Sequence, residues 1–335
     1  MSMKMNRMLL LSALAAVSLV AADKINGAGA SFPAPIYYKW AHDYQAQTGV
    51  QVNYQSIGSG GGIKQIEART VDFGASDEPL EAKRLGESKL LQFPAVVGAI
   101  CLAYNLPELE GKEVKLSNAV VEAIFLGTIT KWNDPKIAAD NAGVALPDKA
   151  ITIAYRSDGS GTTWNFTYWL DKMGKTWHEK VGLGKTVQWP VGIGGKGNEG
   201  VTNMIKQTPG SIGYIETAYA AKNNLPMATL QSAEGTWVKA TTENIMAAAA
   251  NAKWKGEEGF YQILASQPGK NTYPIVAATF ILLPQEKAAE NKEVSKFFTF
   301  AFEKGAAEAE KLGYIPLPKP TVEAIEAYLK TNNAK

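Results

Sequence analysis

Short apolar runs alternate with amphipathic stretches along this chain of 335 residues. Residues 25–30, 50–54 and 71–76 have β-strand character, and helical patterns begin after residue 33 and again at 63–68. In the first helical stretch Ile36, Tyr37, Trp40 and Tyr44 fall on one face, and Gly49 marks its end. This order of strand, turn and helix predicts α/β units with parallel strands.

The second half of the chain continues the same order. It has apolar strand patterns at 96–104, 151–155, 210–215 and 274–283, a helical stretch at 164–170, and a closing helix rich in Phe, Ala, Glu and Lys. A chain of this length is too long to form comfortably around one core, so we expect two domains. The segment Asn105-Leu106-Pro107 predicts a crossing point between them.

Residues 1–22 have the pattern of a cleaved secretion signal. Lys4 and Arg7 precede an apolar run from Leu9 to Val20, and small residues follow at the expected cleavage site. The alternative is a membrane anchor, but the run is shorter than the ~20 residues that a bilayer requires. We therefore predict that Asp23 begins a mature protein located in the periplasm.

Charge and cysteine content narrow the function classes. Without Lys4 and Arg7 the chain has 32 basic and 32 acidic residues, whereas nucleic-acid-binding proteins usually show a basic excess. Cys101 is the only cysteine and lies inside an apolar run, which favours a buried hydrophobic role over a reactive thiol or a lipid attachment point. We expect a freely soluble monomer that binds no nucleic acid.

Three strand-to-helix junctions combine a serine with glycines, around Ser31, Ser59 and Ser160. Glycine lets backbone N–H groups approach a ligand, serine can cap a helix or donate its hydroxyl, and helix N-termini favour anions. A single junction of this kind is best interpreted as ordinary turn chemistry. Three of them, converging at the carboxyl ends of strands, predict an anion site.

Two charged groups sharpen this prediction. Arg156 can offer paired N–H donors to an oxyanion, with Asp158 holding it in place, although spacing alone is equally compatible with a surface ion pair. Asp77 would repel an anion unless the ligand carries a proton, as phosphate and arsenate do and sulfate does not. An acceptor here would thus reject sulfate. The alternative for Asp77 is a cap of the segment 78–81.

Five segments of the chain resemble the periplasmic phosphate-binding proteins (PstS family) of high-affinity phosphate ABC transporters: 27–35, 57–62, 71–77, 156–162 and 194–198. The resemblance extends from Asn26 to near the C-terminus. It implies an α/β fold of the two-domain periplasmic binding protein class (type II-like), hinged, with the ligand in the interdomain cleft. It also implies a discontinuous first domain, 23–105 plus 273–335, and a second domain, 106–272.

Carried over by position, the resemblance places the phosphate contacts on Ala30, Ser31, Phe32, Ser59, Asp77, Arg156, Ser160, Gly161 and Thr162, with Asp158 supporting the arginine. Ser31 stands where the best-known members have threonine, which keeps the hydroxyl, and Gly60 replaces a serine beside the ligand serine. The implied function is to bind inorganic phosphate, with arsenate as a second candidate, and to deliver it to the permease subunits of an ABC importer. Neither catalysis nor a metal or cofactor is implied.

Two alternatives stay open: a binding protein for sulfate, molybdate or another oxyanion, and a secreted phosphatase with Ser59 or Ser160 as nucleophile. The phosphatase is disfavoured because the two histidines, His42 and His178, lie on separate helical patterns without the spacing of a metal site or an evident role as a base.

Three glycine-rich motifs are interpreted as chance matches. Residues 192–197 match G-x-G-x-x-G but lack an acidic partner on a second strand, so we predict a structural loop there. Gly-Lys-Thr at 174–176 and 184–186 lacks the preceding glycine of a nucleotide-binding P-loop. The tryptophans follow no regular period, which favours core packing.

Overall fold

The computed structural model describes residues 24–109 and 111–332, so the predicted signal segment lies outside the described residues. The strands are β1 (Lys24–Gly29), β2 (Gln51–Ser56), β3 (Phe73–Ser76), β4 (Leu90–Tyr104), β5 (Lys115–Leu116), β6 (Thr152–Arg156), β7 (Ile193–Gly195), β8 (Ser211–Glu216), β9 (Thr229–Gln231), β10 (Trp237–Val238) and β11 (Val276–Pro284).

The α-helices are α1 (Ala34–Thr48), α2 (Ser59–Glu67), α3 (Ala82–Ser88), α4 (Asn118–Phe125), α5 (Pro135–Asp140), α6 (Gly161–Met173), α7 (Lys175–Lys180), α8 (Gly197–Gln207), α9 (Thr217–Lys222), α10 (Thr242–Ala249), α11 (Ala288–Lys304), α12 (Ala306–Lys311) and α13 (Lys319–Asn332). Two short 3₁₀ turns cover Pro107–Leu109 and Gly256–Glu258.

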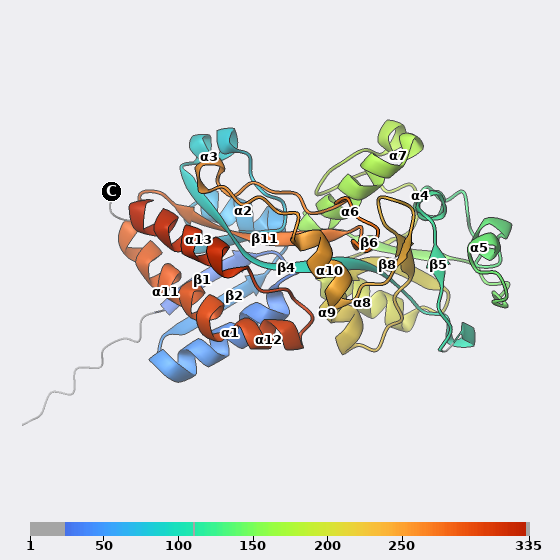
Figure 1. Cartoon of the computed structure of the whole chain (residues 1–335), viewed down its shortest axis with the longest axis horizontal. Coiled ribbons are helices and arrows are strands. Elements are labelled where there is room, and N and C mark those ends of the chain that lie inside the picture. The colour runs from blue at the N-terminus through green and yellow to red at the C-terminus, as the bar shows by residue number, and fades with distance from the viewer. Residues whose placement is uncertain (1–23, 110, 333–335) are drawn as a thin grey trace, which may run out of the picture.

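One long sheet runs through the molecule in the order β2-β1-β3-β11-β4-β8-β6-β7, and β5, β9 and β10 form a small second sheet. Strand β4 joins the two ends of the long sheet: residues 90–99 pair with β11, and residues 100–104 pair with β8. Figure 1 shows β4 passing from one group of helices into the other. The chain therefore forms two lobes, as predicted for a two-domain α/β fold.

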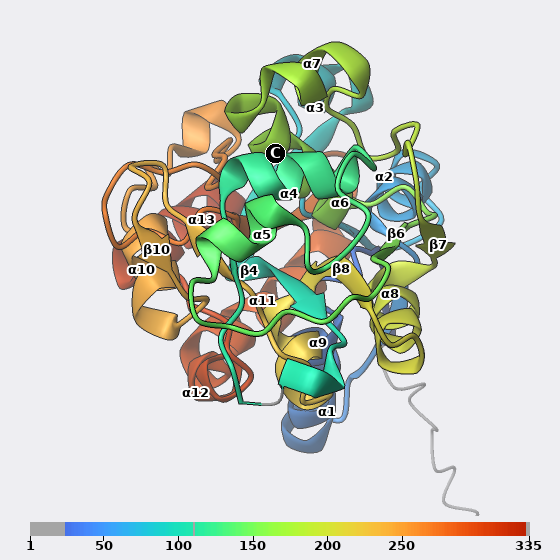
Figure 2. The ribbon, with the colours of Figure 1, turned by 90° about the vertical axis from the view of Figure 1, so that its right-hand side faces the viewer.

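We call the chain up to residue 99, together with β11 and everything after it, the first lobe, and the residues between them the second lobe. Helices α1, α2, α3, α11 and α13 belong to the first lobe, and α4 to α8 belong to the second. Figure 2 shows the second lobe from its outer end, with α4 and α5 toward the viewer. The exact domain boundaries near residues 105 and 273 stay predictions.

The central strands are buried along their whole length. All residues of β4 and of β11 are buried, which suits apolar strands covered on both faces. The predicted face of α1 is confirmed, since Ile36, Tyr37, Trp40 and Tyr44 are all buried. Cys101 is also buried, and burial raises the pKa of its thiol, which confirms its role as a small hydrophobic residue.

The structure corrects several predicted elements. The prediction of parallel strands was wrong for β4 and β11, which run antiparallel to their neighbours. The single closing helix was also wrong, since α11, α12 and α13 follow β11. Strand β4 begins at Leu90, and its Pro94 is accommodated at a bulge of β4, where Ala95 has no partner between Thr279 and Phe280 of β11.

Helix α2 begins at Ser59 rather than at Ile63 as predicted, so the glycine run 60–62 is helical. Glycine weakens isolated helices, which is why the sequence suggested a loop. Here it lets α2 pack onto β1, because a methyl group on Gly62 would lie 2.5 Å from the Cα of Gly29. Close packing in the folded protein thus outweighs the local preference.

Candidate anion-binding site

Four helices begin where strands of the long sheet end. Helix α1 follows β1, α2 follows β2, α6 follows β6 and α8 follows β7. Strands β1 and β2 are parallel, and so are β6 and β7, so the helices of each pair begin at the same edge of the sheet. The two pairs of strands run in opposite directions within the long sheet, so they form two separate edges, one in each lobe. Because helix N-termini carry unpaired N–H groups and partial positive charge, each of these edges favours an anion.

The two lobes touch at these helix N-termini. The N–H of Gly161 in the second lobe donates to Ser59 Oγ in the first lobe at 3.1 Å. The side-chain amide of Asn165 in the second lobe donates to the carbonyl of Asp77 in the first lobe at 2.7 Å. The structure is therefore the closed form of the cleft, and the junctions predicted around Ser59 and Ser160 are brought together.

The hydroxyls of Ser31 and Thr162 are held as hydrogen-bond donors. Ser31 Oγ accepts from Asn198 N at 3.0 Å and from Asn198 Nδ2 at 2.9 Å. Thr162 Oγ1 accepts from Arg156 Nη1 and Asn198 Nδ2, both at 3.1 Å. Since a hydroxyl oxygen has two lone pairs, each group is left with its proton to donate. Asn198 is itself oriented by Glu216, whose N–H donates to its Oδ1 at 2.9 Å.

Ser59 is held in a similar way. Its Oγ accepts from the N–H groups of Asp77 and Gly161, both at 3.1 Å, one from each lobe. Its own proton points to Asp77 Oδ2 at 3.4 Å, which is long for an O–H donor. A ligand oxygen closer than this carboxylate would therefore take over the Ser59 proton.

Arg156 is buried and held by a bidentate pair with Asp158: Nε to Oδ1 at 2.8 Å and Nη2 to Oδ2 at 2.6 Å. Burial opposes the charge of Asp158, but the guanidinium outweighs it and keeps the pKa of Asp158 below its usual value. Gly58 (φ 83°) admits this loop, because a methyl group there would lie 2.3 Å from Asp158 Oδ2. With one further donor used on Thr162, two of the five guanidinium N–H groups stay available for a ligand.

Asp77 is the acceptor of the site. It is 2% exposed, and its Oδ1 has no hydrogen-bond partner among the described residues. Burial raises its pKa to about 7, although the neighbouring Thr279 hydroxyl and the charge of Arg156 lower it. Asp77 thus lies within reach of Ser59 as a carboxyl group that can share a proton with a ligand near neutral pH.

The remaining predicted ligands have structural bonds of their own. Ser160 Oγ caps α6 by accepting from Thr163 N at 2.9 Å, so the helix-cap interpretation is confirmed. The N–H of Ala30 donates to Ala75 O at 3.0 Å, and the carbonyl of Phe32 accepts from Tyr314 at 2.6 Å. Ligand contacts by Ala30, Phe32 and Ser160 stay predictions, and for Ala30 the N–H is already in use.

Comparison with known proteins identifies the family. A family model described as a PBP superfamily domain matches residues 16–304. The phosphate-binding protein PstS of Pasteurella multocida is 52% identical over 314 residues, which cover 92% of this chain and 91% of that protein. The chain belongs to the PstS family. PstS of Haemophilus influenzae is 49% identical, with coverage of 92% and 93%. The resemblance seen in the five segments is thereby confirmed.

A solved structure supports the same fold. The high-affinity periplasmic phosphate-binding protein PfluDING, solved with bound phosphate, aligns with a TM-score of 0.74 over 91% of this chain and 93% of that protein. The two proteins share 21% of their residues, so the likeness concerns the fold. The two-lobed periplasmic binding protein architecture predicted from the PstS resemblance is confirmed.

In this PstS-family chain Asn198 was not among the predicted site residues, although it ends the resembling segment 194–198. The segment 192–197 was predicted to be a structural loop, which was wrong, because it forms β7 and the start of α8. It is a fourth strand–glycine–helix junction, and this pattern was the signal that could have revealed it. Asn198 links Ser31 of the first lobe with Thr162 of the second, so it organises two of the predicted ligand hydroxyls.

Two tyrosines were also missed, because they are far from the junctions in sequence. Tyr219 donates its hydroxyl proton to the carbonyl of Ser31 at 2.6 Å, and Tyr314 donates to the carbonyl of Phe32 at 2.6 Å. The turn before α1 is thus held from the second lobe by Tyr219 and from the first lobe by Tyr314.

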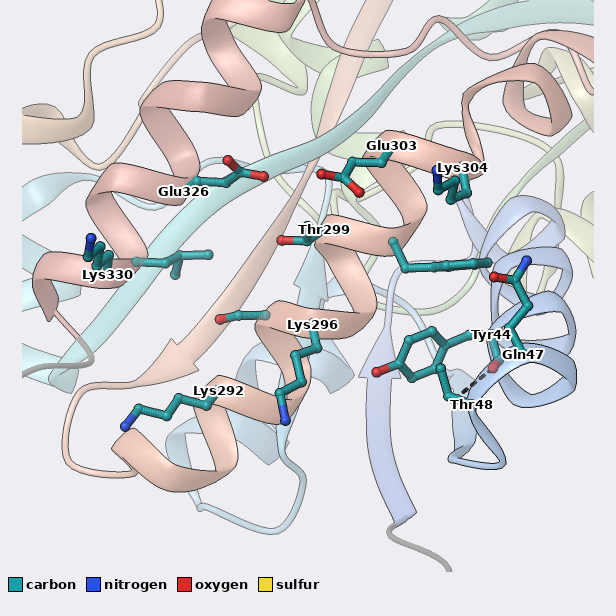
Figure 3. A pocket seen from close by; sticks show the side chains of 13 residues that line it. Tyr44, Gln47, Thr48, Lys292, Lys296, Thr299, Glu303, Lys304, Glu326 and Lys330 are labelled. Carbon is teal, nitrogen blue, oxygen red and sulfur yellow. Dashed lines mark hydrogen bonds between the residues drawn. The ribbon is translucent and has the colours of Figure 1, made fainter.

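A separate groove of about 760 Å³ lies between α1, α11 and α13 (Figure 3). Its lining includes the rings of Tyr44 and Phe300, whose centroids are 5.3 Å apart, and the side chains of Lys292 and Lys330. None of the predicted ligand residues lines it. The groove is therefore distinct from the candidate anion site of this PstS-family protein.

The histidines take no part in the site. His42 on α1 and His178 on α7 are largely exposed and contact Asp43 and Asp171. Over residues 24–109 and 111–332 no cluster of three or more potential metal ligands is found. In the same residues, no helix combines the length and apolar character needed to span a bilayer.

Proposed function

We propose that this chain binds inorganic phosphate between its lobes in the periplasm and delivers it to the permease subunits of an ABC importer. The observation that carries the proposal is the hydroxyl arrangement: Ser31, Ser59 and Thr162 each have their oxygen lone pairs occupied by N–H donors. Such hydroxyls are fixed as donors, which suits a ligand made almost entirely of acceptor oxygens. The curated relatives named phosphate-binding protein PstS support phosphate as that ligand.

Asp77 supports phosphate over a fully deprotonated oxyanion. A buried carboxylate facing sulfate would leave two acceptors opposed, whereas phosphate at neutral pH brings a proton to the contact. The two remaining N–H groups of Arg156 complete the set of donors. Asp158 offsets the guanidinium charge, so the attraction between Arg156 and the bound anion is moderated.

We propose no catalytic step. Ser59 and Ser160 are the only nucleophile candidates that the sequence suggested. Ser59 Oγ has Asp77 as its carboxylate neighbour, at 3.4 Å, and Ser160 Oγ accepts a helix-capping bond. Neither arrangement includes a histidine, since His42 and His178 contact Asp43 and Asp171.

Calorimetric titration of ligand-stripped protein with phosphate, arsenate and sulfate tests the proposal. We expect tight binding of phosphate, detectable binding of arsenate and none of sulfate at pH 8, above the pKa of about 7 of Asp77. Ser31→Ala should weaken phosphate binding, and Ser31→Thr, which keeps the hydroxyl, should restore it. Absence of phosphate binding, or clear hydrolysis of a generic phosphate ester, would overturn the proposal.

A further inference from the structure

An ion pair crosses the cleft beside the candidate site. Glu78 follows Asp77 at the end of β3 in the first lobe, and Lys185 lies between α7 and β7 in the second lobe. The ammonium of Lys185 pairs with Glu78 Oε2, and the two side chains are only 24% and 16% exposed. Other ion pairs of the described residues, such as Lys131–Asp148, join residues within one lobe.

Both ends of this ion pair are fixed to the site by their backbones. The carbonyl of Lys185 accepts from the N–H of Ser160, the cap of α6, at 3.0 Å. The N–H of Glu78 donates to Ser76 Oγ at 3.1 Å, and the Ser76 hydroxyl donates back to Glu78 O at 2.8 Å. Because both backbones are already ordered, forming the pair costs less conformational entropy than pairing two free surface side chains.

We propose that the Glu78–Lys185 pair is a latch that lengthens the residence of phosphate in the closed cleft, an inference that rests on the proposed function. Phosphate cannot leave until the lobes separate, and separating them must break this pair. Neither side chain is among the predicted ligands, so the latch acts on opening rather than on ligand contact. We expect loss of the pair to raise the phosphate release rate about fivefold, which is the effect expected when opening no longer has to break one partly buried ion pair.

A latch and a purely electrostatic effect on the bound anion predict different changes in the rate of phosphate release. If the two charges acted only by attracting or repelling the bound anion, Glu78→Gln would slow release and Lys185→Gln would speed it. If they act as a latch, either substitution removes the same contact and speeds release. The double substitution should then release phosphate no faster than the single ones, because the shared interaction is lost only once.

The test is a chase of radiolabelled phosphate with excess unlabelled phosphate, using wild type, Glu78→Gln, Lys185→Gln and the double variant. Lys131→Gln is the matched control, because it removes the exposed 2.8 Å pair with Asp148 inside the second lobe. We expect about fivefold faster release in all three latch variants and wild-type release in the control.

The outcomes separate the two proposals. If wild type binds phosphate but release is unchanged, shifts in opposite directions in the two single variants, or increases additively in the double variant, the latch is refuted while the binding function stands. If wild type binds no phosphate, the proposed function itself fails and the latch fails with it.

Discussion

Asp77→Asn changes the acceptor of the site while nearly keeping its shape. Asp77 Oδ1 has no partner among the described residues, and Oδ2 has only the long contact with Ser59. The backbone of Asp77 is held separately, by Ser59 Oγ at its N–H and by Asn165 Nδ2 at its carbonyl. The substitution therefore adds a donor and removes a charge without disturbing the contact between the lobes.

The expected magnitudes follow from hydrogen bonding in a buried site. Phosphate loses a charge-assisted hydrogen bond worth about 1.5–3 kcal/mol, or roughly 10- to 100-fold in affinity. Sulfate, which faces an opposed acceptor in the wild type, gains a donor and should recover much of a discrimination of ~10⁴. The preference for phosphate over sulfate should therefore fall by about 10³-fold or more.

Calorimetry of both proteins with phosphate and with sulfate at pH 8, above the pKa of about 7 of Asp77, measures this preference. The control is Asp148→Asn, a carboxylate that is 65% exposed and pairs with Lys131. It should leave both affinities unchanged. If Asp77→Asn kept the wild-type preference, the argument that Asp77 detects the proton of the ligand would be refuted.

Three further predictions concern the same cleft. Gly161→Ala should weaken phosphate binding about 100-fold by calorimetry, because the added methyl group would lie 2.4 Å from Ser59 Oγ and oppose closure; undiminished affinity would contradict this. Arg156→Lys should weaken phosphate binding roughly 10- to 100-fold, because an ammonium cannot make a two-point contact with Asp158 and another with the ligand at once, and an unchanged dissociation constant would contradict a bidentate role. In the closed form, burial raises the pKa of Asp77 to about 7, so this folded form keeps a proton that the unfolded chain loses near pH 4. The stability of the wild-type closed form should therefore fall relative to Asp77→Asn by about 3 kcal/mol between pH 4 and 7 in urea unfolding, and parallel pH profiles would exclude this pKa.

The parts of the site that could be predicted from the sequence are those encoded locally. Ser31, Ser59 and Ser160 each follow a strand pattern and precede a helical one within a few residues, so turn and capping chemistry identifies them without any knowledge of the fold. The same reasoning was available for Asn198. The glycine run before it matches the spacing of a nucleotide motif as well as that of a strand–glycine–helix junction, so the local pattern alone does not separate the two.

Other features depend on contacts between distant residues. Glu78 and Lys185 are 107 positions apart, and the sequence offered Lys185 only as part of a Gly-Lys-Thr motif. The antiparallel placement of β11 between β3 and β4 likewise has no local signal in the sequence. A fully buried strand has the same apolar pattern whether it runs parallel or antiparallel to its neighbours. Tertiary pairing, not local preference, decides both.

The hydroxyls of Ser31 and Ser59 become fixed as hydrogen-bond donors only when the two lobes close. The oxygen of Ser31 is saturated entirely by Asn198 of the second lobe, and one of the two bonds that saturate Ser59 comes from Gly161 of the second lobe. In an open form these hydroxyls would regain free lone pairs and could turn toward water. The affinity for an anion is therefore a property of the closed state, and ligand binding shifts the equilibrium toward closure. A transporter that pulls the lobes apart needs no competing ligand, because separation removes the constraints that make these hydroxyls donors.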